Sequence, residues 1–230
     1  MNCVGARSKK ILKLVTLSLL PTQHSPIIVA SMGRSGSTLI WDALRYGMAN
    51  SRFPWMGKNG VRLVTETAWD LSTIRFKPGV VYKTHGLAHE LPSNCSAKVV
   101  FIFGSATEAA LSVLACRSKY GDHWIKEHFV HLRAKGHIGD LGDRDVLRFG
   151  EQIDGWIGKT GIERLILHYD ALWEHERTLS EFAGVNVKLR PRRPRVSTEA
   201  VDSKTRAFFA QTYSALDERI RLLPTCQLLK

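Results

Sequence analysis

The chain has 230 residues, of which 44% are hydrophobic and 23% are charged. This length and composition suit one large folded domain and exclude a chain that is disordered throughout. Its 33 Lys and Arg against 21 Asp and Glu give a formal net charge of +12, which favours anionic partners (nucleic acid, acidic lipid, acidic glycan or a nucleotide) without choosing among them. A basic surface that serves only to keep the protein soluble explains the charge equally well.

Within residues 1–25, a basic stretch (Arg7, Lys9 and Lys10) precedes an apolar run from Ile11 to Leu20. Polar residues interrupt this run, which is too short to span a membrane. We expect an N-terminal arm or short amphipathic helix that packs on the body of the protein. Peripheral membrane contact through residues 8–20 is the alternative.

The stretch "SPIIVASMG", residues 25–33, is apolar and β-branched, and it predicts a buried strand that ends at a glycine. A loop follows, and "STLIWDALRYGMA", residues 37–49, places its apolar residues near one face of a helix. Strand, glycine-containing loop and helix together form the opening of an α/β unit.

Further elements extend this pattern along the chain. Loop with short helix is expected over residues 51–78, and irregular surface helices over 121–150. The predicted strands are 79–85, 97–104 and 163–169, and the predicted helices are 105–121, 151–161, 176–185 and 202–223. Apolar runs of this kind are typical of strands buried on both faces of a parallel sheet. We therefore predict one α/β domain over residues 26–230, with helices on both faces of the sheet.

The loop from Gly33 to Thr38 carries the clearest chemistry. In a parallel sheet, such a loop presents backbone N–H groups and a helix N-terminus to a ligand beyond the strand ends. Arg34 adds a guanidinium suited to phosphate or sulfate oxygens, and Ser35, Ser37 and Thr38 are expected to add hydroxyl donors. The pattern predicts an anion site. A plain Ser-Gly turn before a helix is the alternative.

The nucleoside-triphosphate version of this device is G-x-x-x-x-G-K-[ST]. Here Ser37 and Thr38 directly follow Gly36, with no lysine between them, and Ser31 stands where the first glycine is required. The cation precedes the glycine instead of following it. A kinase-type loop is therefore disfavoured.

"GRSGSTLIWDAL" resembles the 5′-phosphosulfate-binding loop of sulfotransferases, which use 3′-phosphoadenosine 5′-phosphosulfate (PAPS) as sulfuryl donor, and its Arg-Ser-Gly-Ser form is especially similar to that of carbohydrate sulfotransferases. Four more stretches resemble the family in the right order: "VVYKTHG", "VVFIFGSATEAALSVL", "ILHYDALWEH" and "TLSEFAGV". Together they cover roughly residues 26–190. The resemblance implies a sulfotransferase-like parallel-sheet domain that needs no metal.

The resemblance also implies roles. Gly33, Ser35, Gly36, Ser37 and Thr38 would cradle the 5′-phosphate, with Arg34 stabilising charge on the sulfuryl and bridging oxygens. His85 would be the general base, since an ordinary histidine pKa lies near neutral pH, and Lys83 shares its face of the strand. Glu66 is the rival base, because some carbohydrate sulfotransferases use a carboxylate in an early segment.

One position departs from the family. The third strand of the family normally ends in Arg-Asp-Pro, whose arginine grips the 3′-phosphate, whereas this chain has Gly104, Ser105 and Ala106. The later serine of that motif is present as Ser112. Candidate replacement cations are Arg117 and, in the basic loop, Arg190, Arg192, Arg193 and Arg195. A donor without a 3′-phosphate, or a protein that has lost catalysis, would also explain the change.

The leading hypothesis is a cytoplasmic PAPS-dependent sulfotransferase, which leaves adenosine 3′,5′-bisphosphate as product and acts on a hydroxyl acceptor such as a carbohydrate or glycolipid. The four scattered cysteines, which form no metal or disulfide pattern, agree with a reducing compartment. A non-catalytic protein that binds acidic glycan or nucleic acid is the second hypothesis, although no specific nucleic-acid motif is present. A P-loop kinase is the third.

Overall fold

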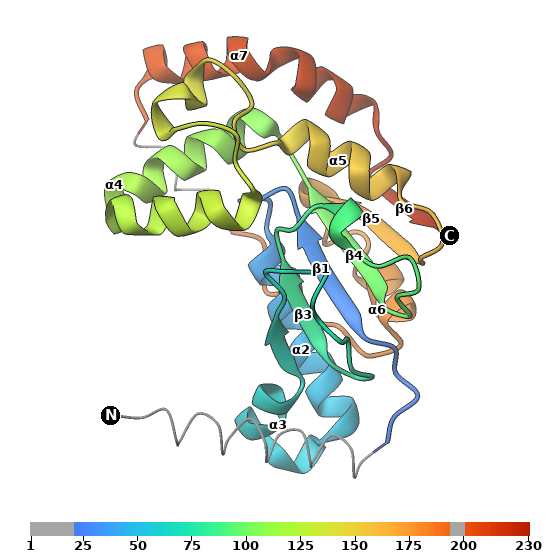
Figure 1. The fold of residues 1–230 in the computed structure, drawn as a ribbon. Coiled ribbons are helices and arrows are strands. Elements are labelled where there is room, and N and C mark those ends of the chain that lie inside the picture. Colours follow the sequence, from blue (N-terminus) through green and yellow to red (C-terminus); the bar gives the residue numbers. More distant parts are fainter. Residues whose placement is uncertain (1–20, 194–200) are drawn as a thin grey trace.

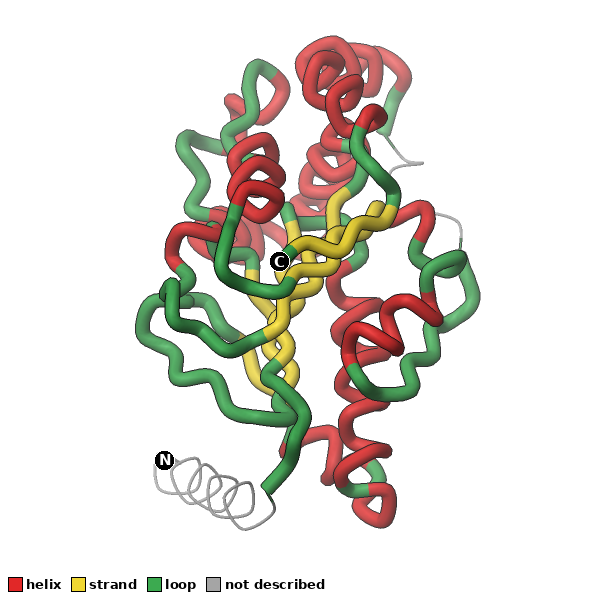
Figure 2. Tube along the Cα trace, turned by 90° about the vertical axis from the view of Figure 1, so that its right-hand side faces the viewer, coloured by secondary structure: helices red, strands yellow, loops and turns green. Residues whose placement is uncertain are grey.

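The computed structural model describes residues 21–193 and 201–230, which form a six-stranded sheet between two layers of helices (Figure 1, Figure 2). The strands are β1 (Ile27–Ser31), β2 (Thr65–Thr67), β3 (Val81–Thr84), β4 (Lys98–Phe103), β5 (Arg164–His168) and β6 (Cys226–Leu229). Their order is β2-β3-β1-β4-β5-β6, and neighbouring strands are parallel except β5 and β6. The predicted α/β fold with a parallel sheet is confirmed.

Helices cover both faces of this sheet. They are α2 (Ser37–Arg52), α3 (Lys58–Leu63), α4 (Ala106–Leu132), α5 (Phe149–Gly158), α6 (Glu176–Ala183) and α7 (Ser203–Leu222). Short 3₁₀ turns are η1 (Pro54–Met56), η2 (Ala88–Glu90), η3 (Ile138–Gly142) and η4 (Tyr169–Ala171). Side chains of α2, α3 and α6 form one hydrophobic core, and those of α4, α5 and α7 form the other.

Strand β1 shows why the apolar runs of the sequence are continuous. Ile27 and Val29 belong to the core under α2, whereas Ile28 and Ala30 belong to the core under α4. Every residue of β1 is buried, because the strand lies between β3 and β4 and has a helical layer on each face. This central position places the loop after β1 in the middle of the edge formed by the carboxyl ends of the strands.

Helix α4 differs most from expectation. The sequence predicts that it ends near residue 121, but the helix continues to Leu132 after a kink at Gly121, whose φ of 78° and ψ of −179° are not helical. Beyond the kink, Ile125, His128 and Leu132 are buried, at the spacing of one helical face. The kink turns this second half across the end of the sheet.

Two strands were not predicted. Strand β2 lies within residues 51–78, where loop and short helix were expected, and it is held by parallel pairing to β3. Strand β6 pairs antiparallel with β5. Both are short edge strands, so pairing with a neighbour rather than their own sequence defines them.

The arm predicted over residues 1–25 lies outside the described residues as far as residue 20, and residues 21–26 form neither helix nor strand. Within the two described ranges, each helix is either too short or too polar to span a membrane. Arg195 of the basic loop also lies outside the described residues.

Candidate active site

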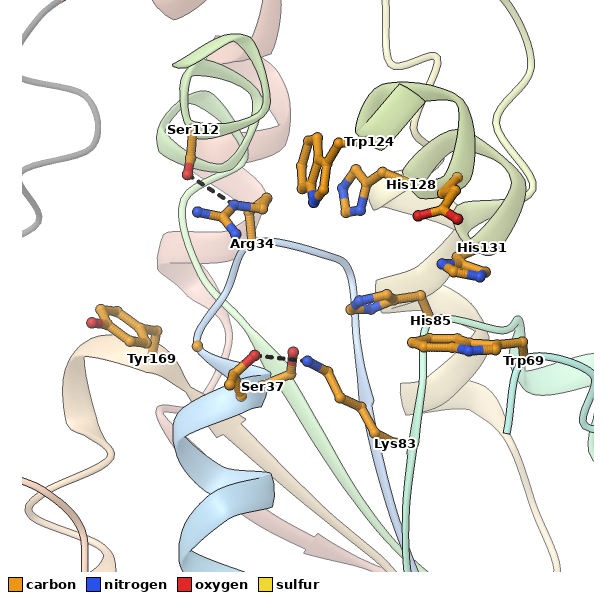
Figure 3. Close-up of a pocket in the computed structure, with 13 residues that line it drawn as sticks. Arg34, Ser37, Trp69, Lys83, His85, Ser112, Trp124, His128, His131 and Tyr169 are labelled. Carbon is orange, nitrogen blue, oxygen red and sulfur yellow. Dashed lines mark hydrogen bonds between the residues drawn. The ribbon is translucent and has the colours of Figure 1, made fainter. Parts of the chain in front are cut away.

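A cavity of about 470 Å³ opens beyond the carboxyl ends of β1 and β3, at the N-terminus of α2 (Figure 3). Residues from six parts of the chain line it: the loop before α2, the first turn of α2, the end of β3, the segment after β2, helix α4 and η4. The sequence-predicted residues among them are Arg34, Gly36, Ser37, Thr38, Lys83, His85 and Ser112. The structure therefore brings the loop and the strand-end residues into one cavity.

The loop owes its shape to left-handed backbone conformations. Gly33, Arg34 and Gly36 have φ angles of 90°, 52° and 88°, a region that glycine enters without strain. Gly36 is also hemmed in, because a Cβ atom on it would lie 2.4 Å from Cδ2 of Tyr169. The N-terminus of α2, which starts at Ser37, consequently opens directly into the cavity with its first N–H groups.

Of the three hydroxyls expected to donate to an anion, that of Ser35 is not available for this role. Its hydroxyl donates a hydrogen bond of 2.9 Å to the carbonyl of Ile102 in β4, and the side chain is buried. This bond anchors the loop to the sheet and leaves only the backbone N–H of Ser35 as a donor for a ligand. Ser37 and Thr38 both line the cavity.

Two cations flank the loop. Nε of Arg34 donates to Oγ of Ser112 at 3.0 Å, and its guanidinium lies 5.8 Å from the ring centroid of Trp124. Nζ of Lys83 reaches from β3 and donates to Oγ1 of Thr38 at 2.7 Å, the lower dashed line in Figure 3. Burial lowers the pKa of Lys83. Lys83 thus supplies at the loop a lysine that the local sequence lacks.

His85 lies at the floor of the cavity and is 8% exposed. Its Nδ1 is 3.0 Å from Oγ of Ser31 and 3.3 Å from the carbonyl oxygen of Ser31. The side chain of Gln152 donates to the backbone carbonyl of His85 at 2.6 Å and accepts from Nε1 of Trp156 at 3.1 Å. A proton on Nδ1, donated to Ser31, leaves Nε2 as an acceptor.

The expectation that His85 titrates near neutral pH is wrong. Burial, assisted by the charge of Lys83, lowers its pKa to about 3, because a low-dielectric environment disfavours the charged imidazolium. His85 is therefore neutral at physiological pH, which is the protonation state that a general base requires.

Glu66, the rival base, is not among the residues that line the cavity. It pairs with Tyr82 in the β2–β3 ladder, whereas Lys83 pairs with Thr67. Since neighbouring strand residues point to opposite faces, Glu66 lies on the other face of the sheet from Lys83. The carboxylate that does line the cavity is Glu127 of α4.

Glu127 belongs to a wall that sequence analysis did not identify residue by residue. The wall consists of Trp69, Trp124, Glu127, His128 and His131, with Tyr169 on the other side of the loop. Trp69 stacks on His131 with ring centroids 3.9 Å apart, and Trp124 stacks on His128 at 4.7 Å. The local feature that could have indicated this wall is the helical spacing of Ile125, His128 and Leu132 beyond Gly121, which places His128 on the buried face of a helix.

A second cavity, of about 520 Å³, adjoins the first, and Tyr169 lines both. It contains Gly104 together with Arg192 and Arg193 of the basic loop. Nη2 of Arg192 donates to the carboxylate of Asp170 at 2.8 Å. The structure therefore brings two of the candidate replacement cations to the position of the missing arginine.

Of the other three candidate cations, Arg117 and Arg190 lie elsewhere and Arg195 is outside the described residues. Arg190 lies 3.4 Å from the carboxylate of Asp42 in α2 and lines neither cavity. Arg117 pairs with Asp122 at 2.8 Å and is not among the residues of either cavity. Ser112 lines the first cavity, where it accepts from Arg34.

A carboxylate from a distant helix occupies the N-terminus of α4. Asp217 of α7 accepts hydrogen bonds from the backbone N–H of Ala106 at 2.6 Å and of Thr107 at 3.2 Å, and from the hydroxyl of Ser105 at 3.1 Å. A helix N-terminus attracts anions, and here the protein supplies its own. In the described ranges, no group of three or more His, Cys, Asp or Glu side chains is arranged to hold a metal ion.

No protein-family model matches this sequence, and no curated protein matches it either. Among solved structures, the chain is similar to two of retinol dehydratase. One is in complex with androsterone and the inactive cofactor PAP, with 12% identity over 88% of this chain and 72% of that chain and a TM-score of 0.43. The other is in a complex with retinol and PAP, with 12% identity over 89% and 67% and a TM-score of 0.44. What the site can do chemically is decided by its own residues.

Proposed function

We propose that this protein is a sulfotransferase, which moves a sulfuryl group from PAPS to the hydroxyl of an acceptor. The observation that carries the proposal is the convergence of four features in one cavity. These are the N-terminus of α2, the guanidinium of Arg34, the ammonium of Lys83 and the neutral imidazole of His85. An anion site and a base side by side are what transfer of a charged group to a hydroxyl requires.

The cradle fits the 5′-phosphosulfate of the donor. Backbone N–H groups from Ser35 to Thr38 would hold the 5′-phosphate at the start of α2, where the absence of a Cβ on Gly36 lets the loop pack against Tyr169. Arg34 and Lys83 would contact the sulfuryl and bridging oxygens. The resemblance of the Gly-Arg-Ser-Gly-Ser-Thr loop to sulfotransferases supports a phosphosulfate rather than a triphosphate.

The reaction follows from this placement. Nε2 of His85 takes the proton of the acceptor hydroxyl while the hydroxyl oxygen forms a bond to sulfur. The bond between sulfur and the bridging phosphate oxygen breaks, and its electron pair stays on that oxygen of the departing adenosine 3′,5′-bisphosphate. Arg34 and Lys83 stabilise the developing charge. The bound anionic donor raises the proton affinity of His85, which opposes the effect of burial.

The second cavity is our proposed place for the 3′-phosphate of the donor. Its support is the presence of Arg192 and Arg193 beside Gly104, since guanidinium groups suit phosphate oxygens. The resemblance also supports a role for Ser112 in cofactor binding. Its hydroxyl accepts from Arg34 and would hold that guanidinium toward the donor.

A carbohydrate or glycolipid is the acceptor we propose, on the Arg-Ser-Gly-Ser form of the loop. A cytoplasmic location is proposed on the free thiols of Cys95, Cys116 and Cys226. Glu66 as base has no support from the cavity, so His85 is the base in this proposal.

The test uses the purified full chain with sulfur-labelled PAPS and a pool of carbohydrate, glycolipid and small hydroxyl acceptors. We expect a labelled sulfate ester with the wild type and at least about a hundredfold loss of turnover in Arg34→Ala. Arg177→Ala removes an exposed arginine of α6 that pairs with Glu181 and is the matched control. Nucleotide binding without transfer to any acceptor would favour the non-catalytic alternative, and absence of both would refute the sulfotransferase.

A further inference from the structure

His128 has a buried ring nitrogen that lacks a partner. The residue is 7% exposed, and its Nε2 has no hydrogen-bond partner in the parts of the chain that the structure describes. A buried polar atom left in this state has lost its hydrogen bonds to water without a replacement, which destabilises the folded protein. Such atoms in folded proteins call for an explanation, such as a ligand or water that completes them.

The position of His128 in the cavity is set from three sides (Figure 3). Its ring stacks on Trp124, whose ring also lies next to the guanidinium of Arg34. The His85 ring meets it edge to face with centroids 5.8 Å apart. A Cβ atom on Gly33 would lie 3.6 Å from Cε1 of His128, the ring carbon bonded to Nε2. The ring of His128 therefore lies against Gly33 at the start of the loop, in contact with His85 and with Trp124, which adjoins Arg34.

We propose that Nε2 of His128 donates a hydrogen bond to an oxygen of the sulfuryl group during its transfer. This assignment rests on the proposed function, and it adds a catalytic residue from α4 to those of the loop and β3. Arg34, His85 and His128 line the same cavity, and His128 contacts both His85 and Trp124, the neighbour of Arg34. Sulfuryl oxygens accept hydrogen bonds, so the tautomer protonated on Nε2 is the one that serves them.

A neutral donor suits this position. Burial lowers the pKa of His128 well below its ordinary value, and the nearby His85 and Arg34 act in the same direction. Before the donor binds, the imidazole consequently carries one N–H and no charge. Its stacking on Trp124 fixes the ring plane before the substrate arrives, which preorganises the donor.

The experiment compares variants of the full chain in two measurements, turnover with saturating PAPS and acceptor, and affinity for adenosine 3′,5′-bisphosphate, which lacks the sulfuryl group. His128→Phe keeps a ring to stack on Trp124 and removes the nitrogen. We expect turnover to fall about a hundredfold and the affinity for the bisphosphate to stay within about twofold. His123→Phe, the same change at an exposed position of α4, is the control.

Two further variants keep the test decisive if His128→Phe folds poorly. His128→Gln places an amide nitrogen near the position of Nε2, whereas His128→Asn places it near that of Nδ1, so the glutamine variant should turn over faster. The assignment is overturned if His128→Phe keeps its turnover, if bisphosphate affinity falls as much as turnover, or if asparagine restores activity better than glutamine. A wild type that neither binds the bisphosphate nor transfers refutes the proposed function, and this assignment with it.

Discussion

The ring of Tyr169 closes over Gly36, so that a Cβ atom on this glycine would lie 2.4 Å from Cδ2 of the tyrosine. Gly36 has a φ of 88°, which an alanine adopts only with strain. The contact joins the loop after β1 to η4, two segments that are far apart in the sequence. It also places Tyr169 between the two cavities.

Gly36→Ala should therefore destroy the cradle. We expect the affinity for adenosine 3′,5′-bisphosphate to fall at least about tenfold, because the loop or the tyrosine must move by more than a flexible side chain can absorb. Titration calorimetry measures this. Gly158→Ala is the control, since a Cβ there meets nothing within 4 Å. Unchanged affinity in Gly36→Ala would show that the loop does not bind the nucleotide.

His85 gives the stability of the fold a defined pH dependence. Its pKa is lowered from 6.5 to about 3, so between these values the unfolded chain binds a proton that the native state does not. Stability is thus lost as the pH falls below 6.5. From pH 7.5 to pH 5, His85 alone should lower the free energy of unfolding by about 2 kcal/mol.

Urea unfolding of the wild type and of His85→Asn at both pH values isolates this contribution. The asparagine variant should lose about 2 kcal/mol less than the wild type on acidification. His123→Asn, at an exposed histidine, should follow the wild type. If acidification lowered the free energy of unfolding by the same amount in the wild type and in His85→Asn, His85 would not be held neutral in the native state.

Gln152 is predicted to position the catalytic base. It is fully buried and joins the backbone of His85 to the indole of Trp156. Gln152→Leu leaves both groups without a partner, which should destabilise the protein by about 2–4 kcal/mol. Gln152→Glu keeps the acceptor for Trp156 but loses the donor to His85. If His85 is positioned by this bond, turnover falls in Gln152→Glu while the KM for the donor is unchanged. A change in KM as large as the change in turnover would contradict a positioning role for Gln152.

Arg192 and Arg193 are predicted to recognise the 3′-phosphate. The double variant Arg192→Ala/Arg193→Ala should weaken binding of adenosine 3′,5′-bisphosphate about tenfold or more and leave binding of adenosine 5′-phosphate nearly unchanged. Comparing the two nucleotides by calorimetry separates loss of the 3′ contact from general damage. Equal weakening of both nucleotides would place the 3′ end outside this cavity.

Asp217 should oppose the 3′-phosphate. Its carboxylate holds the N-terminus of α4 beside the second cavity, where a further anion meets like charge. Asp217→Asn keeps a hydrogen-bond acceptor and removes the charge. We expect the ratio of affinities for the bisphosphate and adenosine 5′-phosphate to rise about fivefold. A ratio that stays constant would mean that the 3′-phosphate binds away from α4.

Much of this architecture is encoded locally. The apolar run around Ile28 predicts a strand buried on both faces, and the pattern from Gly33 to Thr38 predicts an anion loop before a helix. Lys83 and His85 could be placed together from strand alternation alone. Each of these inferences depends on residues within a few positions of one another, which is the range over which backbone geometry is fixed.

Other features depend on contacts that no local pattern contains. Glu66 looked like a rival base until pairing with β3 placed it on the other face from Lys83. The low pKa of His85 arises from burial by the whole fold, which residue type alone does not reveal.

The sequence by itself determined strands β1, β3, β4 and β5, the anion loop and the pair of residues at the end of β3, because these follow from periodicity and turn chemistry. Only the tertiary structure decided which side chains complete the cavity. The kink at Gly121 carries His128 onto the loop, and packing of α7 brings Asp217 to the start of α4. Both are long-range contacts, whose partners are chosen by the packing of layers rather than by neighbours along the chain.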